Sequence, residues 1–357
     1  MLRNDRMNII AIETSCDETA VALLQSTATG LSVVKNIVSS QIDLHKQYGG
    51  VVPEIAARAH SETLVPLLQK QIGLKTLKSA DLIAVTAGPG LITSLMIGVQ
   101  AAKTLSFMLQ KPLVGINHLE GHIYANWLPH RDGSRNKQVQ ALFQKPKQFF
   151  PALALVVSGG HTEFVMIRNH GDYKLLGQTV DDAAGESFDK VSKILGLGYP
   201  GGPIISTLAV KGNPKAIDFP RPMLASKDYN MSFSGLKTAV LYYLEKKKNV
   251  KKSEIPDVVA SFQQAVIDVL IAKMQKAIAE HRPRSLMMGG GVSANPALRE
   301  AVMALGGKNT IPVFIPDLQY TGDNAAMIGA VAYFRRKEAS KTLWKTLAFN
   351  PQWYTMR

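Results

Sequence analysis

Two histidines, His118 and His122, have a spacing that suits one shared metal ion. The sequence around them is apolar and predicts a helix with Asn117 as its N-cap. Residues four apart lie about one helical turn from each other, so both imidazoles are expected on one face. The alternative interpretation is that the two side chains pack or cap separately.

A metal site needs at least one more protein ligand. Asp323 is the best candidate, because it begins a helix predicted over residues 323–336 that we expect to return to the N-terminal domain. Its other interpretation is an acid at a helix N-terminus, stabilised by the helix dipole. Glu13, Asp17 and Glu18 are alternative ligands.

The histidine pair does not match the metalloprotease motif, in which a glutamate directly follows the first histidine. Here Glu120 is two residues after His118, which places it about 200° around the helix. It cannot polarise a water on a metal bound by the pair, so a protease is disfavoured.

Two glycine-rich turns follow predicted strands and are candidates for holding a nucleotide. The first contains Val156, Val157, Ser158, Gly159 and Gly160. Its glycines expose backbone N–H groups that can bind phosphate, although a plain hairpin turn uses the same residues. The second covers residues 289–296, where three glycines permit close approach of a base or sugar. Asn295 in this turn is either an N-cap or a ligand contact.

Residues 182–195 predict a helix with one narrow charged stripe. The stripe contains Asp182, Glu186, Asp189 and Lys193. A solvated helix face explains such a stripe. The rigid, glycine-rich loop 198–203 that follows, which includes Gly202, favours a site in which a carboxylate holds ribose hydroxyls.

The elements that position these residues occur twice. Residues 9–12 and 19–24 predict two strands around a tight turn, and residues 152–157 and 162–167 repeat that plan. Each copy is followed by a buried strand, a glycine loop and a helix. We therefore expect an α/β fold of two duplicated domains, with the glycine turns facing a central cleft that binds a nucleotide.

Composition limits what such a protein can be. The 357 residues carry 41 Lys and Arg against 27 Asp and Glu, a formal charge of +14, and this favours an anionic partner such as a nucleic acid. The single cysteine, Cys16, excludes an internal disulfide. No signal peptide and no apolar stretch of 18 residues is evident, so we expect a soluble, cytoplasmic protein without membrane association.

The predicted domain organisation follows the repeat. Residues 1–128 form the first domain, which is completed by a C-terminal helix within 323–357. Residues 129–150 are basic, lack periodicity and predict a mobile loop. Residues 151–322 form the second domain with the nucleotide-binding loops. A second basic run, 246–252, has five lysines and is either the solvated end of a helix or a nucleic-acid contact.

These motifs together resemble the TsaD family, also called Gcp or YgjD, of bacterial-type tRNA N6-adenosine threonylcarbamoyltransferases. The resemblance rests on IETSCDET at 12–19, GGVVPEIAARAH at 49–60, NHLEGH at 117–122, VSGGHTE at 157–163, DDAAGESFDK at 181–190, GGGVSANPALR at 289–299 and TGDNAAMIG at 321–329. It covers nearly the whole chain. The 129–150 loop looks longer than is usual in the family.

The resemblance implies an actin-like (ASKHA, RNase H-like) fold and a set of site residues. It implies that His118, His122 and Asp323 bind one Fe²⁺, or Zn²⁺, per subunit. It implies that Val156, Val157, Ser158, Gly159, Gly160, Asp189, Gly202 and Asn295 hold the adenylate of the substrate. No residue stands out as a general base, and Glu18 or Asp17 is the candidate.

The implied reaction moves threonylcarbamoyl from its adenylate to N6 of the adenosine next to the tRNA anticodon, in tRNAs that read codons beginning with adenine. The implied partners are tRNA, threonylcarbamoyl-AMP, the paralogue TsaB as a heterodimer, the ATPase TsaE and a TsaC-type synthase that makes the donor. Two other functions remain open from the residues alone. One is an actin-like ATPase or sugar kinase, which the histidine pair suits badly because Mg²⁺ prefers oxygen ligands. The other is a non-catalytic RNA-binding scaffold.

Overall fold

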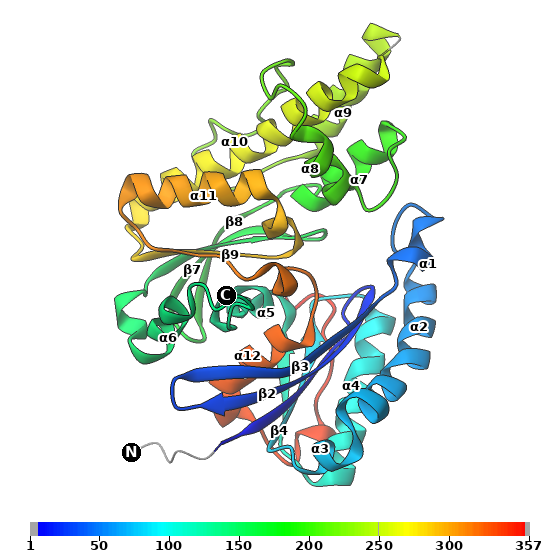
Figure 1. Cartoon of the computed structure of the whole chain (residues 1–357), viewed down its shortest axis with the longest axis vertical. Helices are drawn as coiled ribbons and strands as arrows, with labels where there is room; N and C mark the ends of the chain where they lie inside the picture. Colours follow the sequence, from blue (N-terminus) through cyan, green and yellow to red (C-terminus); the bar gives the residue numbers. More distant parts are fainter. Residues whose placement is uncertain (1–5, 249, 354–357) are drawn as a thin grey trace. The chain divides into compact units, whose positions relative to one another are not determined.

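The computed structural model describes residues 6–248 and 250–353, which form two compact units (Figure 1). Unit 1 consists of Met1–Gln148 with Pro316–Arg357, and unit 2 is Phe149–Ile315. Each unit contains one five-stranded mixed sheet with helices.

The sheet of unit 1 has the strand order β3-β2-β1-β4-β5. Its strands are β1 (Asn8–Glu13), β2 (Glu18–Thr27), β3 (Gly30–Ser40), β4 (Leu82–Gly88) and β5 (Leu113–Asn117). The first three strands pair antiparallel, whereas β4 and β5 extend the sheet parallel to β1. Its helices are α1 (Ile42–Lys46), α2 (Pro53–Pro66) with a π-helical extension (Leu67–Ile72), α3 (Leu74–Lys78), α4 (Ile92–Leu109), α5 (His118–Tyr124), α6 (Asn136–Gln144) and α12 (Ala325–Arg335).

Unit 2 repeats this plan, with the order β10-β9-β6-β7-β8. Its strands are β6 (Ala152–Val157), β7 (Thr162–Asn169), β8 (Asp172–Gln178), β9 (Ser285–Gly289) and β10 (Val313–Phe314). Its helices are α7 (Ala184–Ile194), α8 (Gly201–Ala209), α9 (Ser234–Lys247), α10 (Ile255–His281) and α11 (Pro296–Asn309). Strand pairing matches unit 1 in order and direction, so the predicted duplication is confirmed.

Helices cover the sheets because the central strands β1, β4 and β6 are nearly continuous apolar runs that are buried on both faces. In unit 1, one face of β1 and β2 packs Ile10, Ile12 and Val21 against residues of α2 and α4. The helix α12 packs against β1, β2 and α5, and so returns to the N-terminal sheet. In unit 2, α10 and α11 lie side by side (Figure 1) and build a core with α7, α8 and one sheet face.

Two helices correct the expectation that no apolar stretch is long enough for a membrane. By length and composition alone, Ile92–Leu109 and Lys252–His281 pass such a test. Buried core helices pass it too. Apolar residues of α10 such as Val259, Phe262 and Val266 lie in the core of unit 2, and Leu95 and Val99 of α4 are buried in unit 1.

The predicted segment boundaries need two corrections. The predicted loop 129–150 is wrong over α6, whose Val139 and Leu142 are buried, and the segment up to Gln148 belongs to unit 1. The chain re-enters unit 1 at Pro316 rather than at residue 323. The helix predicted over 323–336 is confirmed as α12, and Ser340 then pairs with Leu113 of β5. Residues 354–357 of the predicted segment 323–357 lie outside the described residues.

Candidate functional site

The histidine pair lies at the start of α5, directly after β5. Asn117 ends the strand, and its side-chain Oδ1 accepts hydrogen bonds from the N–H groups of Leu119 and Glu120 at 2.9 and 3.2 Å. The predicted N-cap is therefore confirmed. The short helix places the rings of His118 and His122 with centroids 4.7 Å apart at an angle of 79°.

Asp323 lies close to this histidine pair, although it belongs to the C-terminal segment of unit 1. It immediately precedes Asn324, whose side chain caps α12 by accepting from the N–H of Met327 at 3.0 Å. Asp323 Oδ1 lies 3.4 Å from His118 Nε2 and 3.2 Å from His122 Nε2. The structure thus brings the three predicted ligands together, with one donor atom from each within 4.8 Å of the others.

Glu13 holds the far side of the His118 ring. Its Oε2 lies 3.1 Å from His118 Nδ1 and accepts a 2.5 Å hydrogen bond from the Thr86 hydroxyl, while its Oε1 accepts from the N–H of Ser15. Glu13 is fully buried. With Nδ1–H donated to Glu13, the Nε2 atom of His118 faces Asp323 as a ligand atom. The alternative of Glu13 as a ligand is not what this geometry supports.

The charges of Glu13, His118, His122 and Asp323 shift one another's pKa values. Burial opposes a charged His118, but the carboxylates of Asp323 and Glu13 outweigh it and raise the pKa of His118 well above its ordinary value. Burial also opposes ionisation of Asp323, yet the two histidines lower its pKa. Burial lowers the pKa of His122, which favours the neutral ring that a metal ligand needs.

These residues fit a transition metal. Two imidazole nitrogens and one carboxylate oxygen form a donor set that suits iron or zinc. His122 is 1% exposed, and neither of its ring nitrogens makes a well-directed hydrogen bond within the described part of the chain. Buried ring nitrogens without such bonds are what a metal ligand set leaves when no ion is present.

Asp17 and Glu18 lie in the turn between β1 and β2 and are half-buried. Glu18 Oε1 accepts from the Ser40 hydroxyl at 3.2 Å. Burial, with the neighbouring carboxylates of Asp323 and Asp17, raises the pKa of Glu18 to about 10. In this charge state Glu18 is protonated at neutral pH and cannot accept a proton, whereas a cation at the histidine pair would lower its pKa.

Glu120 points away from the pair, as predicted. It is 1% exposed, and its Oε1 lies 2.5 Å from Nη2 of Arg335 on α12. This buried ion pair joins α5 to α12, and these two helices position all three clustered residues.

The first glycine turn of unit 2 has open space on one side and close packing on the other. Ser158 N donates to His161 O at 2.8 Å, which closes the turn. A Cβ added at Gly159 or Gly160 would meet no atom within 4 Å. Behind the turn, a Cβ on Gly185 would lie 2.6 Å from Ser158 O, and one on Gly290 would lie 2.3 Å from Val157 O. Only glycine fits these two places, so the start of α7 and the loop after β9 both pack closely against this turn.

The other predicted adenylate contacts have structural partners of their own. Val156 and Val157 are fully buried within β6, so neither offers an exposed surface to a ligand. Asp189 Oδ1 accepts from Gly201 N at 2.7 Å and joins α7 to the start of α8. Gly202 has open space where a Cβ would stand. Asn295 caps α11, and its Nδ2 donates to Gln263 Oε1 at 2.7 Å, so the capping interpretation holds.

A second possible ligand group in unit 1 escaped the sequence analysis because its members are distant in sequence. His130, Asp132 and Asp317 offer atoms within 4.8 Å of one another. Asp317 Oδ2 accepts from Arg131 N at 3.1 Å and Oδ1 from Gln319 N at 3.2 Å. Its carboxylate is therefore already used by the backbone.

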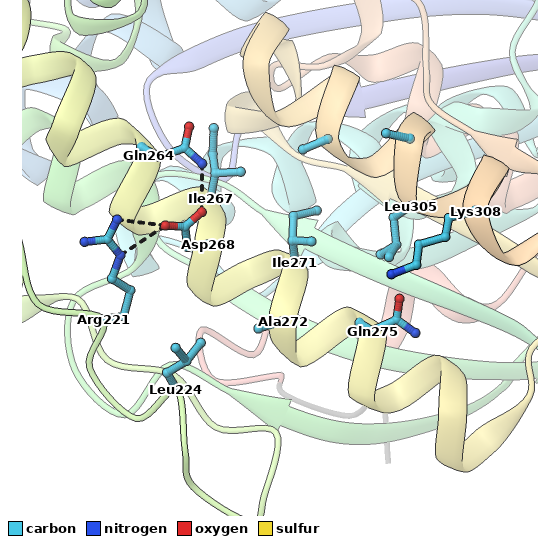
Figure 2. A pocket seen from close by; sticks show the side chains of 12 residues that line it. Arg221, Leu224, Gln264, Ile267, Asp268, Ile271, Ala272, Gln275, Leu305 and Lys308 are labelled. Carbon is cyan, nitrogen blue, oxygen red and sulfur yellow. Dashed lines mark hydrogen bonds and ion pairs between the residues drawn. The ribbon is translucent and has the colours of Figure 1, made fainter. Parts of the chain in front are cut away.

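A groove of about 660 Å³ lies in unit 2 between α10, α11 and the segment around Arg221 (Figure 2). Ile267, Ile271 and Leu305 line it, and Arg221 binds Asp268 at 2.8 Å across one end. None of the predicted site residues lines this groove.

Comparisons with known proteins identify the family of this chain. The family model described as "TsaD: tRNA N6-adenosine threonylcarbamoyltransferase" matches residues 32–330. Proteins of that name from Carboxydothermus hydrogenoformans and Thermosipho africanus are 48% and 47% identical. Each match covers 92% of this chain, and 92% and 94% of the respective relative. The chain belongs to the TsaD family of transferases.

The fold of this TsaD-family chain is also found in a solved structure of HypF from T. kodakarensis, with a TM-score of 0.59 and 11% identity over 96% of this chain and 50% of that one. The similarity supports the actin-like fold alone. Within the family chain, sequence reasoning missed how Glu13 orients His118, although the segment IETSCDET that contains Glu13 was recognised as a motif.

Proposed function

We propose that this chain forms N6-threonylcarbamoyladenosine in tRNA by transferring threonylcarbamoyl from threonylcarbamoyl-AMP to the adenosine 3′-adjacent to the anticodon, in tRNAs that read codons beginning with adenine. Family membership supports the reaction class. The observation that carries the assignment of the site is the convergence of His118, His122 and Asp323 within 4.8 Å.

The metal we propose for this cluster is one Fe²⁺ per subunit, with Zn²⁺ as the alternative. When bound there, the ion would supply Lewis acidity for the carbamoyl carbonyl or anchor the threonyl carboxylate. Glu13 fixes the orientation of His118 from behind. His118 would hold the ion through Nε2 in its neutral form, so it would give up the proton that Asp323 and Glu13 stabilise on the metal-free ring.

The adenylate belongs to the glycine loops of unit 2. The exposed turn at Gly159 and Gly160 has open space for a ligand, and its backbone N–H groups suit the phosphate of AMP. In the transfer, the adenosine N6 forms a bond to the carbamoyl carbon and the carbon–oxygen bond to phosphate breaks. AMP leaves with the bonding electrons, and N6 loses a proton.

The acceptor of that proton is Asp17 or Glu18. Burial and the carboxylates around it raise the pKa of Glu18 to about 10 without a metal, and a cation at the histidine pair would lower it. Both residues are therefore candidates for the proton acceptor.

The partners follow from the same proposal. The basic residues of two clusters are exposed and suit a phosphate backbone. These residues are Arg131, Arg135, Lys137, Lys145 and Lys147 in the first, and Lys246, Lys247, Lys248, Lys251 and Lys252 in the second. We propose a bacterial-type assembly with the paralogue TsaB, the ATPase TsaE and a TsaC-type synthase that supplies the donor. This places the protein in the cytoplasm, without a membrane partner.

The test is reconstitution with defined components. Wild-type protein, the proposed partners, threonylcarbamoyl-AMP and a tRNA transcript are incubated, and the nucleosides are analysed by mass spectrometry. Threonylcarbamoyladenosine is expected, and the Asp323→Ala variant should fold without producing it. Binding of tRNA without any modified adenosine would support the scaffold function instead.

A further inference from the structure

A chain of buried polar side chains in unit 1 has no part in the function described so far. Gln41 is the N-cap of α1, His45 lies in α1 and His60 lies in α2. All three residues are at most 4% exposed. Burying three polar side chains side by side costs free energy unless each is hydrogen-bonded. Their bonds form one continuous path.

The path joins two backbone groups. Val52 N lies 3.3 Å from His45 Nδ1, and His45 Nε2 lies 3.2 Å from Gln41 Oε1. Gln41 Nε2 lies 3.3 Å from His60 Nδ1, and His60 Nε2 lies 2.9 Å from Cys16 O. The path therefore runs from the start of α2 to the turn that holds Asp17 and Glu18.

The direction of every bond is fixed by its two ends. A backbone N–H only donates, so His45 accepts at Nδ1 and donates at Nε2 to the Gln41 carbonyl. The Gln41 amide then donates to His60 Nδ1, and His60 Nε2–H donates to the Cys16 carbonyl, which only accepts. Each ring then carries its proton on Nε2, and the single lone pair of His60 Nδ1 is shared between the Gln41 amide and the closer Thr19 hydroxyl.

The turn is held at three neighbouring residues. Besides the Cys16 carbonyl, His60 Nδ1 lies 2.8 Å from the Thr19 hydroxyl. Gln41 adds a backbone bond, in which its N–H donates to Asp17 O at 3.0 Å. Asp17 and Glu18 thus stand on a segment whose backbone is fixed on both sides by Gln41 and His60.

We propose that His60 is a positioning residue for the transfer reaction, acting with Gln41 and His45 to fix the Cys16–Glu18 turn and its two carboxyl groups. This inference rests on the proposed function of that turn. An apolar side chain could fill the space of His60, but it could neither donate to Cys16 O nor accept from Gln41. The hydrogen-bonded side chains therefore fix the position of the turn in addition to filling the space between α1, α2 and the sheet.

The experiment compares three variants in the reconstituted assay with partners. His60→Leu removes the ring's hydrogen bonds to Cys16, Gln41 and Thr19, and His60→Gln restores an N–H donor for Cys16 O. Leu64→Ala is the matched control, because Leu64 is a buried residue of the same helix that faces the apolar core of unit 1. We measure kcat, the KM values for donor and tRNA, the metal content and the thermal midpoint.

We expect His60→Leu to lower kcat by about tenfold to a hundredfold, which is what displacement of catalytic groups by about 1 Å costs, with KM values and metal content little changed. His60→Gln should recover most of the loss. Leu64→Ala should lower the thermal midpoint and leave kcat near that of the wild type. A His60→Leu variant that keeps its kcat, or loses no more than Leu64→Ala, overturns the proposal.

The hydrogen-bond chain has a readout that is independent of activity. Nitrogen NMR of ¹⁵N-histidine-labelled protein should show neutral His45 and His60 with the proton on Nε2, and a proton on Nδ1 of either ring would overturn the chain. A wild type that transfers nothing overturns the proposed function and the positioning role with it. A wild type that transfers, together with an unaffected His60→Leu variant, overturns the positioning role alone.

Discussion

Glu13 Oε2 and Asp323 Oδ1 lie on opposite sides of the His118 ring, 3.1 Å from Nδ1 and 3.4 Å from Nε2. Glu13 therefore orients the ring, and Asp323 lies beside the nitrogen that would bind the metal. Glu13 comes from β1 and Asp323 from the segment before α12, so the orientation of the His118 ring depends on the packing of α12 onto the sheet.

The His118, His122 and Asp323 cluster should retain about one transition metal per chain, and His118→Ala and His122→Ala should each lose it. Glu13→Gln should keep the ligands but weaken metal affinity by about 10-fold to 100-fold, because it loses the charged partner of Nδ1. Elemental analysis and competition with a chelator measure both effects. Full occupancy in both histidine variants would show that the metal, if any, binds elsewhere.

The Glu120→Ala variant tests whether Glu120 stabilises the fold or binds the metal. The buried Glu120 pairs with Arg335, which is partly exposed and keeps Glu338 as a second partner, so removal of Glu120 should cost about 1.5–3 kcal/mol, as for a hydrogen bond to a charged group. We expect this loss in the free energy of unfolding with the metal content unchanged, measured by denaturant titration and elemental analysis. Glu338→Ala is the control, because Glu338 binds the same arginine from an exposed position. Metal loss in Glu120→Ala at full folding would assign Glu120 to the ligand set.

The metal-free protein should become less stable as the pH rises. The pKa of His118 is raised above its ordinary 6.5, chiefly by Asp323 and Glu13 against burial, so the folded state binds a proton that the unfolded chain releases. That contribution is complete below about pH 6.5 and is lost as the pH rises through the folded pKa. Denaturant titrations after chelation measure the trend. Asp323→Asn should flatten it, and a wild type without the trend would contradict the coupling.

Glu163 on β7 gives a second pH dependence. Burial raises the pKa of this carboxyl to about 7 from an ordinary 4.5, and Glu163 is 6% exposed. The folded state therefore keeps a proton that the unfolded chain loses, and the contribution of Glu163 to stability falls by about 3 kcal/mol between these two pH values. Burial of His170 lowers its pKa to about 4 and acts in the opposite direction over a similar range, so the test is the difference between wild type and Glu163→Gln. That difference should favour Glu163→Gln increasingly from pH 5 to pH 8. The exposed Glu300→Gln is the control, and a Glu163→Gln curve parallel to that of the wild type would contradict the assignment.

The second basic cluster tests how tRNA binds. Lys247 is 2.5 Å from Glu254, whereas Lys246, Lys248 and Lys252 are exposed near the end of α9. Replacing these three with glutamine should reduce the slope of log K against log salt by about 0.7–0.9 for each phosphate that the variant no longer neutralises. Filter binding of tRNA at several salt concentrations measures this slope. An unchanged slope would make the run the solvated end of α9 and direct attention to Arg131, Arg135 and Lys137.

Much of this architecture was predictable, for reasons visible in particular residues. The hairpin of β1 and β2 follows from the apolar residues on both sides of the 14–18 turn, and the helical spacing of His118 and His122 follows from Asn117 as N-cap. The hydrogen-bond chain through His60 was not predictable, because it depends on contacts between α1, α2 and a turn more than 40 residues earlier. α6 escaped prediction because its apolar face, Val139 and Leu142, is short and is flanked by the basic residues Arg135, Lys145 and Lys147.

The reaction class predicts that ATP is not needed once the donor is supplied. The mixed anhydride of threonylcarbamoyl-AMP already carries the activation, so the protein has only to hold the carbonyl near N6, polarise it and accept AMP as leaving group. The turn at Gly159 and Gly160 has open space for a phosphate, and we expect ATP to bind there and to be hydrolysed slowly. We expect threonylcarbamoyladenosine from wild-type protein, its partners, the adenylate and tRNA in the absence of ATP, detected by nucleoside mass spectrometry. Product that appears only with hydrolysable ATP would favour a kinase-like ATPase on the same fold, because phosphoryl transfer and not the anhydride would then supply the driving force.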